Sequence, residues 1–191
     1  LIRDVPLSEL RALVGAQDSA TLLSLMHEIQ VSAGDSIFVP HGMLHAIGAG
    51  ILLAEVQEPE DLSILLEWTG FDLDGERDGH LGLGFDLALT AVESHGRSIS
   101  EVEEFVLRNS PEGSVLPESA DPFFRLDRVT SSRDFPSGFA IVIVIGGSAK
   151  LISEAGSSME LPAGSTVLIP HAAGSFHIDG DALVARPPRC E

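Results

Sequence analysis

The chain has 191 residues, 44% of them hydrophobic, and its formal net charge is −18 at pH 7. This length allows one large domain or two small ones, each with a real core. The many acidic side chains would repel nucleic acid and anionic membranes, so neither is expected as a partner. The single cysteine, Cys190, cannot form an internal disulfide. It predicts a reducing compartment, most simply the cytoplasm.

Residues 1–30 are predicted to form a helical segment. One helix is expected over about 6–14 and a second over about 18–30, with Asp18 as the N-cap of the second. The leucines and methionine of the second helix recur at helical spacing, which is typical of a stripe that faces a core.

The pattern changes after Ser32 to short apolar runs separated by Pro, Gly or acidic residues. Three of these runs, at 36–39, 51–57 and 63–68, are interpreted as strands of an antiparallel β structure. The run at 51–57 starts apolar on both faces, so it is expected to be covered on both sides. In the run at 63–68, a period of two places Ser63, Leu65 and Glu67 opposite Ile64, Leu66 and Trp68.

The rest of the chain divides into helical, linker-like and β-rich parts. Helices are predicted over 85–93 and 99–108. Residues 109–122 are rich in Pro, Ser and Gly and have no periodicity, so they are interpreted as a linker. From 123 to 191, short apolar runs recur every 8–12 residues or so, which predicts a sandwich or small barrel.

The stretch GDSIFVPHGMLHAIGAG, residues 34–50, follows the pattern G-x5-P-x-G-x2-H. Gly34 allows a tight turn, Pro40 ends the apolar run, and Gly42 provides an unusual backbone angle or a close approach. His45 is then expected to begin a strand at the mouth of a small barrel, where polar groups can bind a metal or a ligand. The alternative is a turn histidine bonded to a backbone carbonyl.

A degraded copy of this pattern occurs later in the chain. Gly164 and Pro170 repeat G-x5-P, but Ala172 occupies the glycine position and Ser175 the ligand position. Two nearby histidines are weaker candidates for a site, namely His171 and His177.

The first pattern resembles the second conserved motif of the cupin superfamily, whose final Asn falls at Ala49 here. This resemblance implies a mainly β bicupin, with two jelly-roll-like barrels and a helical insertion near the N-terminus. Residues 31–108 would then hold the C-terminal part of the first barrel together with helices. Residues 123–191 would form a second barrel that has lost its metal.

The continuation of the motif resembles the type I mannose-6-phosphate isomerases over roughly residues 1–110. The family string H-A-I-G-x-G…E-x-Q…D matches at 45–50, Glu55, Gln57 and Asp61. The resemblance implies isomerisation of mannose 6-phosphate, or a related sugar phosphate, to the ketose. It also implies a Zn²⁺ ion held by a Gln, two His and a Glu, of which His45 is one.

The remaining site residues follow from the same resemblance. Glu55 and Gln57 are the catalytic candidates, and Glu67 and His41 are the substrate-binding candidates. Leu65 stands where the family has an Arg, a place for which Arg77 or Arg97 could substitute.

The other three metal ligands of the family lie upstream of the motif. Because the chain begins at Leu1 without a Met, we expect it to be a piece of a longer protein. Two other interpretations stay open, namely a non-catalytic cupin that binds a sugar and an incomplete fragment of an isomerase. No oligomeric state is predicted.

Overall fold

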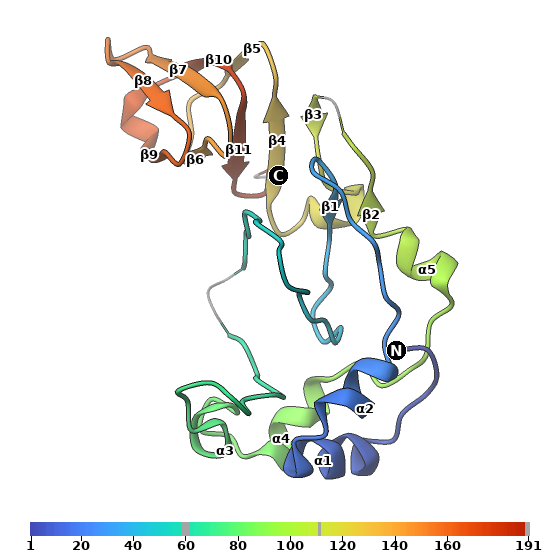
Figure 1. Cartoon of the computed structure of the whole chain (residues 1–191). Coiled ribbons are helices and arrows are strands. Elements are labelled where there is room, and N and C mark those ends of the chain that lie inside the picture. The colour runs from blue at the N-terminus through green and yellow to red at the C-terminus, as the bar shows by residue number, and fades with distance from the viewer. Residues whose placement is uncertain (59–61, 111, 190–191) are drawn as a thin grey trace. The chain divides into compact units, whose positions relative to one another are not determined.

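The computed structural model describes residues 1–58, 62–110 and 112–189 (Figure 1). Cys190 and Asp61, both used above, lie outside the described residues. The chain is mainly β and divides into two compact units. Unit 1 comprises Leu1–Gln30, Val39–Ile51 and Pro59–Phe105, and unit 2 comprises Val31–Phe38, Leu52–Glu58 and Val106–Glu191.

Unit 1 is built from short helices. They are α1 (Leu7–Ala16), α2 (Ser19–Ser24), α3 (Gly75–Asp78), α4 (Phe85–Ala88), the 3-10 helix η1 (Leu89–Ala91) and α5 (Ile99–Glu103). Their core includes Leu10 and Val14 of α1, Leu22 of α2, and Phe85 and Leu89 of α4 and η1.

The predicted helices all occur, and those predicted over 18–30, 85–93 and 99–108 are shorter than expected. Asp18 caps α2 by accepting a hydrogen bond from the amide of Thr21 at 3.1 Å. Ser98 begins α5 with a capping box, in which Glu101 bonds back to the amide of Ser98. Capping side chains satisfy the free amides of a helix start, so these residues fix where each helix begins.

Unit 2 contains all the strands that the structure describes. They are β1 (Ser36–Ile37), β2 (Val106–Leu107), β3 (Gly113–Ser114), β4 (Arg125–Val129), β5 (Ser132–Phe135), β6 (Ala140–Ile143), β7 (Ser148–Ser153), β8 (Ser158–Pro162), β9 (Thr166–Ile169), β10 (Phe176–Gly180) and β11 (Ala182–Arg186). Two 3-10 helices accompany them, η2 (Glu118–Ala120) and η3 (His171–Ala173).

Two antiparallel sheets of unit 2 enclose one core. One sheet has the order β5-β10-β7-β8 and the other β3-β4-β11-β6-β9, while β1 and β2 form a separate pair. The core takes buried residues from both sheets, including Phe135 and Ile178 from the first and Val129, Val142 and Val184 from the second. The sandwich or barrel predicted for the C-terminal part of the chain is therefore present.

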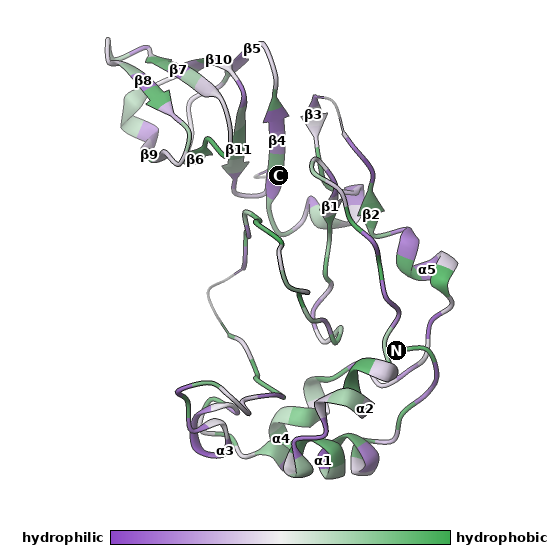
Figure 2. Ribbon diagram, viewed as in Figure 1, coloured by the Kyte–Doolittle hydropathy of each residue, from purple (hydrophilic) through white to green (hydrophobic). Residues whose placement is uncertain are grey.

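The strands predicted at 51–57 and 63–68 are wrong: neither segment forms a strand. A strand needs a neighbour for a continuous ladder of backbone hydrogen bonds. The described residues form no ladder with either segment, and 63–68 has only the bond from the amide of Leu65 to the carbonyl of Gly79 at 2.8 Å. The run at 51–57 is not covered on both sides either, since Leu52 is 84% exposed. Figure 2 shows hydrophobic colour along this trace.

The alternation predicted for 63–68 is present even without a strand. Ile64, Leu66 and Trp68 pack against the core of unit 1, and Trp68 stacks on Phe85 with ring centroids 5.4 Å apart. The backbone amide of Trp68 donates to Gln17 Oε1 of the α1 C-cap at 2.8 Å. Burial of these three side chains and the hydrogen bond from Trp68 to Gln17 thus hold the segment without the ladder of backbone hydrogen bonds that a strand would have.

Residues 109–122 contain β3 and η2, and Val115, Leu116 and Ala120 are buried. Ser114 of β3 pairs with Asp127 of β4. The interpretation of 109–122 as a linker stays a prediction about domain boundaries, while its backbone contributes an edge strand to unit 2.

Candidate functional site

The motif around His45 begins with a turn that lies in unit 2. Gly34 has a φ of +94°, a conformation that favours glycine. The next residue, Asp35, accepts hydrogen bonds from the amides of Ser32 at 3.0 Å and Asn109 at 2.9 Å. Arg108 Nη1 also lies 3.0 Å from Asp35. These bonds hold the pKa of Asp35 below its ordinary value, the amide of Ser32 contributing most.

Gly42 meets both expectations placed on it. Its φ is +77°, and a Cβ at this position would lie 2.5 Å from the carbonyl oxygen of Ala91. The amide of Glu93 donates to the carbonyl of Gly42 at 2.9 Å. The motif is therefore held against the segment that follows η1, at a distance that only a glycine permits.

His45 is exposed and follows this glycine without beginning a strand. Its Nδ1 donates to the carbonyl oxygen of Met43 at 3.0 Å. That bond fits the alternative of a turn histidine. It also places the proton on Nδ1 and leaves Nε2 with a free lone pair, which is the arrangement of many metal-bound histidines.

The other predicted site residues are distributed over both units. His41 and Glu67 belong to unit 1 with His45, and Glu55 and Gln57 belong to unit 2. All four are exposed. The hydrogen bonds described within unit 1 do not join His41, His45 or Glu67 to one another.

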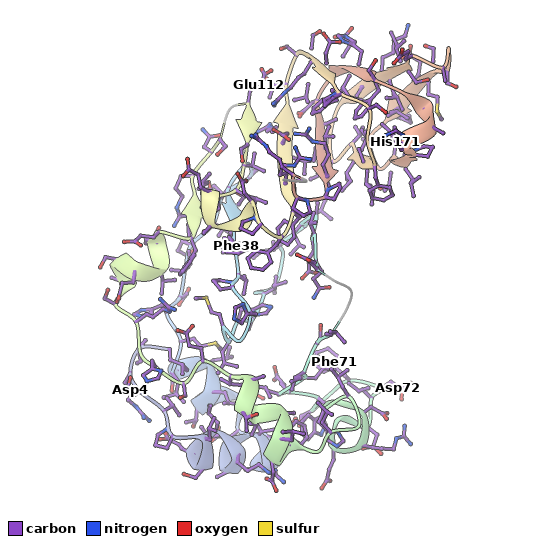
Figure 3. The ribbon with its side chains drawn as sticks, turned by 180° about the vertical axis from the view of Figure 1, so that it is seen from behind. Asp4, Phe38, Phe71, Asp72, Glu112 and His171 are labelled. Atoms are coloured by element: carbon purple, nitrogen blue, oxygen red, sulfur yellow. The ribbon has the colours of Figure 1, made fainter. Side chains whose placement is uncertain are left out.

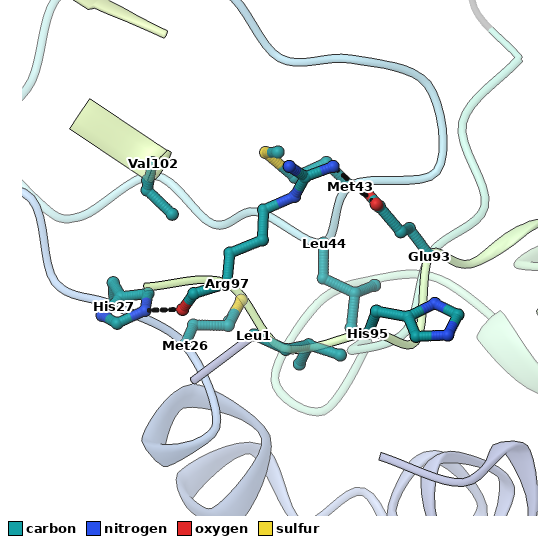
Figure 4. Close-up of a pocket in the computed structure, with 9 residues that line it drawn as sticks. All are labelled: Leu1, Met26, His27, Met43, Leu44, Glu93, His95, Arg97 and Val102. Carbon is teal, nitrogen blue, oxygen red and sulfur yellow. Dashed lines mark hydrogen bonds and ion pairs between the residues drawn. The ribbon is translucent and has the colours of Figure 1, made fainter. Parts of the chain in front are cut away.

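A small cavity of about 50 Å³ lies beside the motif in unit 1 (Figure 4). Met43 and Leu44 form part of its wall, and polar side chains form the rest, namely His27, Glu93, His95 and Arg97. Sequence reasoning did not single out this group, because its members come from segments far apart in the chain. Of the residues that line this cavity, only Arg97 was named from the sequence as a possible site residue, as a substitute for the missing Arg.

Arg97 is the cation of this cavity. It forms an ion pair with Glu93 at 2.5 Å, and its guanidinium lies over the ring of Phe105 at 5.7 Å. Its backbone carbonyl accepts a hydrogen bond from His27 Nε2 at 2.7 Å (Figure 4). The other substitute cation, Arg77, is exposed and pairs with its neighbour Asp78 at 2.6 Å.

Leu65 occupies the family's Arg position and is held by its backbone, whose amide donates to the carbonyl of Gly79 at 2.8 Å. Its side chain is 39% exposed. Phe71, which follows six residues later in unit 1, is 68% exposed (Figure 3). An exposed apolar side chain thus occupies the position at which the sequence resemblance implies a cation.

The degraded copy of the motif lies in unit 2 and does not assemble a site. Gly164 keeps a φ of +86°, and His171 lies in η3 between β9 and β10 (Figure 3). His177 lies on the outer face of β10, because its neighbours Phe176 and Ile178 are the buried ones. There it bonds Asp134 at 2.7 Å and Ser132 at 3.1 Å.

The described residues do not fit a zinc ion by themselves. Within the described ranges, no group of three His, Cys, Asp or Glu side chains is close enough to hold a metal. A catalytic Zn²⁺ needs about three protein ligands, and His45 would be one. We therefore assign no step of a reaction to a metal within these residues.

No family model matches the chain. The mannose-6-phosphate isomerase of Streptococcus mutans is 27% identical over 177 residues, which is 91% of this chain and 53% of that protein. The mannose-6-phosphate isomerase ManA of Bacillus subtilis is 27% identical over 167 residues, covering 83% of this chain and 50% of the relative. The chain is a homologue of mannose-6-phosphate isomerases. The resemblance predicted from the sequence is confirmed.

The chain spans about half the length of the curated isomerases that it matches. Among solved structures, one from Archaeoglobus fulgidus, named as a proposed mannosephosphate isomerase, has a TM-score of 0.41 at 16% identity. The match covers 56% of this chain and 34% of the Archaeoglobus fulgidus chain. A cupin-2 domain protein of Shewanella frigidimarina has a TM-score of 0.30 at 14% identity, and the match covers 40% of this chain and 78% of the Shewanella chain. In the described part of the chain, no helix combines the length and apolarity needed to cross a membrane.

Proposed function

We propose that the chain is part of a sugar-phosphate isomerase that interconverts mannose 6-phosphate, or a related aldose phosphate, and its ketose. The homology to mannose-6-phosphate isomerases carries this proposal. The reaction moves a proton between C1 and C2 through an enediol, so it requires a general base beside the sugar. Glu55 is the carboxylate that we propose for this role, with Gln57 as a hydrogen-bonding partner of the hydroxyls.

The proposed architecture is a bicupin whose first barrel is incomplete in these residues. Support comes from the apolar run 51–57, which has strand-like alternation but no described neighbour, and from Leu52 at 84% exposure. Strands donated by additional polypeptide would satisfy the free backbone groups and cover these side chains. The half-length match to the isomerases agrees with such a missing part. In this architecture the N-terminal helices α1 and α2 belong to the helical insertion.

In the same proposal His45 is the ligand that this chain contributes to a Zn²⁺ site. Its Nδ1–H donates to a backbone carbonyl, which leaves Nε2 for the ion. His41 and Glu67 are proposed to contact the sugar. Arg97 provides a cation in the wall of the cavity that Met43 and Leu44 of the motif also line.

An activity measurement with a matched histidine control tests the proposal. Mannose 6-phosphate is supplied to the purified full-length protein that contains this chain, with and without added Zn²⁺, and fructose 6-phosphate is measured. We expect turnover that falls by about a hundredfold or more in His45→Ala, since ligand loss removes the metal. His171→Ala, the corresponding histidine region of unit 2, should keep turnover within about twofold of the parent. If no fructose 6-phosphate forms with or without Zn²⁺, the proposed isomerase activity is refuted.

A second function, a sugar-binding cupin without turnover, is favoured by one observation. Leu65 stands at the Arg position with its side chain 39% exposed, so it supplies no charge for the phosphate or the carbonyl. This function predicts that mannose 6-phosphate raises the melting temperature while no ketose forms. A melting temperature that does not respond to the sugar phosphate would exclude it.

A further inference from the structure

Nearly half of the basic residues of this acidic chain lie on three strands of unit 2 or close after one of them. The chain has only 11 Lys and Arg residues against 29 Asp and Glu. Five of the 11 lie on β4, β5 and β11 or directly after β11, namely Arg125, Arg128, Arg133, Arg186 and Arg189. Figure 2 shows hydrophilic colour on β4, although this strand lies between β3 and β11 in its sheet.

Three of these arginines face the interior between the two sheets. On β4, Arg125 lies on the same face as Asp127 and the fully buried Val129, because alternate residues share a face. On β11, Arg186 shares a face with the buried Val184.

The third inward-facing arginine comes from the opposite sheet. On β5, Arg133 pairs with the buried Ile178 and shares a face with Phe135. The guanidinium groups of Arg133 and Arg186 lie over the Phe135 ring, at 5.2 and 5.0 Å from its centroid. The two sheets therefore bring their arginines to one end of a shared core.

One carboxylate is shared among these cations. Asp127, whose side chain is 7% exposed, lies 2.5 Å from Arg186 Nη2 and 3.1 Å from Arg133 Nη1. Arg186 is itself only 13% exposed, and its Nε is buried without a hydrogen-bond partner. Asp127 pairs with only two of the three guanidinium groups. The charge of Asp121 also acts on Arg125, so three cations face two carboxylates at this end of the core.

Arg125 is the cation that Asp127 does not pair with. It lies directly opposite Arg186 in the β4–β11 register, and like charges in that position repel each other. Its Nε donates to the carbonyl of Pro187 at 2.9 Å, which turns the guanidinium toward the end of β11. Burial first, and then the charges of Arg186 and Arg189, lower the pKa of Arg125.

We propose that this end of unit 2 binds a phosphate group, with Arg125 and Arg186 as its principal contacts. The start of β4 and the end of β11 lie side by side here (Figure 1). A guanidinium offers two parallel N–H donors that match phosphate oxygens, and an anion placed between opposed arginines removes their repulsion. This proposal rests on residues other than those proposed for the isomerase, and it does not depend on that activity.

Calorimetric titration of the purified chain tests the site with inorganic phosphate as the probe. Saturable binding is expected, and Arg125→Gln should weaken it by about tenfold or more, because a charge-assisted contact is lost. Arg128→Gln is the matched control: it lies on the same strand but on the opposite face, 3.7 Å from Asp181, and should change the Kd by less than about twofold. Circular dichroism confirms that both variants keep the fold.

Two further titrations identify the source of the phosphate group. Mannose should give no Arg125-dependent binding. Mannose 6-phosphate that binds more tightly than inorganic phosphate, with the same loss in Arg125→Gln, would mark a sugar phosphate as the ligand. Equal affinities would mark free phosphate. Binding that fails to saturate, or that falls equally in Arg125→Gln and Arg128→Gln, overturns the proposal.

Discussion

Removing the carboxylate of Asp127 should destabilise unit 2 more than removing any exposed carboxylate of the chain. In Asp127→Asn, Arg186 remains 13% exposed and loses a partner at 2.5 Å. Breaking a buried ion pair by deleting one member costs about 3–5 kcal/mol, because the other charge stays buried and unpaired. Arg133 is 35% exposed and water can solvate it, so we expect the lower end, about 3 kcal/mol.

Urea unfolding followed by circular dichroism measures this loss. With a slope of about 1–3 kcal/mol per molar urea, the midpoint of the β transition should fall by about 1–3 M. Trp68, the only tryptophan, lies in unit 1, so its fluorescence follows the unfolding of that unit. Asp181→Asn is the matched control: its partner Arg128 is 3.7 Å away, and exposed pairs contribute about 0–1 kcal/mol. A loss in Asp127→Asn no larger than the loss in Asp181→Asn would refute this reasoning.

Two further predictions concern the turn and the glycine of the motif. Gly42→Ala should lower the free energy of unfolding by about 1–3 kcal/mol or more, because φ is +77° and the Cβ would meet the carbonyl of Ala91. Gly50→Ala, with a φ of +81° and open space, is the control that carries only the strain of the backbone, and equal losses would contradict the close contact. Asp35, whose pKa is lowered, should contribute stability that is present above the ordinary carboxyl range and lost as the pH falls through its folded pKa. Unfolding measured against pH should lose that part of its acid dependence in Asp35→Asn, and an unchanged profile would contradict it.

The sequence by itself determined those features that depend on local interactions. Asp18, the predicted N-cap, caps α2 because a capping side chain bonds amides only a few residues away. Gly42 was identified as a special position because no other residue tolerates its backbone angle and close approach. The predicted alternation of buried and exposed side chains at 63–68 is also present, since burying every second side chain needs only an apolar surface next to the segment.

Only the tertiary structure decided which segments became strands and where charges met. The run at 51–57 has the composition of a strand, yet a ladder requires neighbours, and the described residues provide none. The second copy of the motif does form β9, because β6 lies beside it.

The arginine end of unit 2 shows the same limit of local information. Arg125 and Arg186 are 61 positions apart in the numbering, and they become opposed only through the register of β4 with β11. Arg133 joins them from the other sheet. Periodicity in the sequence states which side chains share a face of one strand, whereas the packing of two sheets determines which charges share one carboxylate.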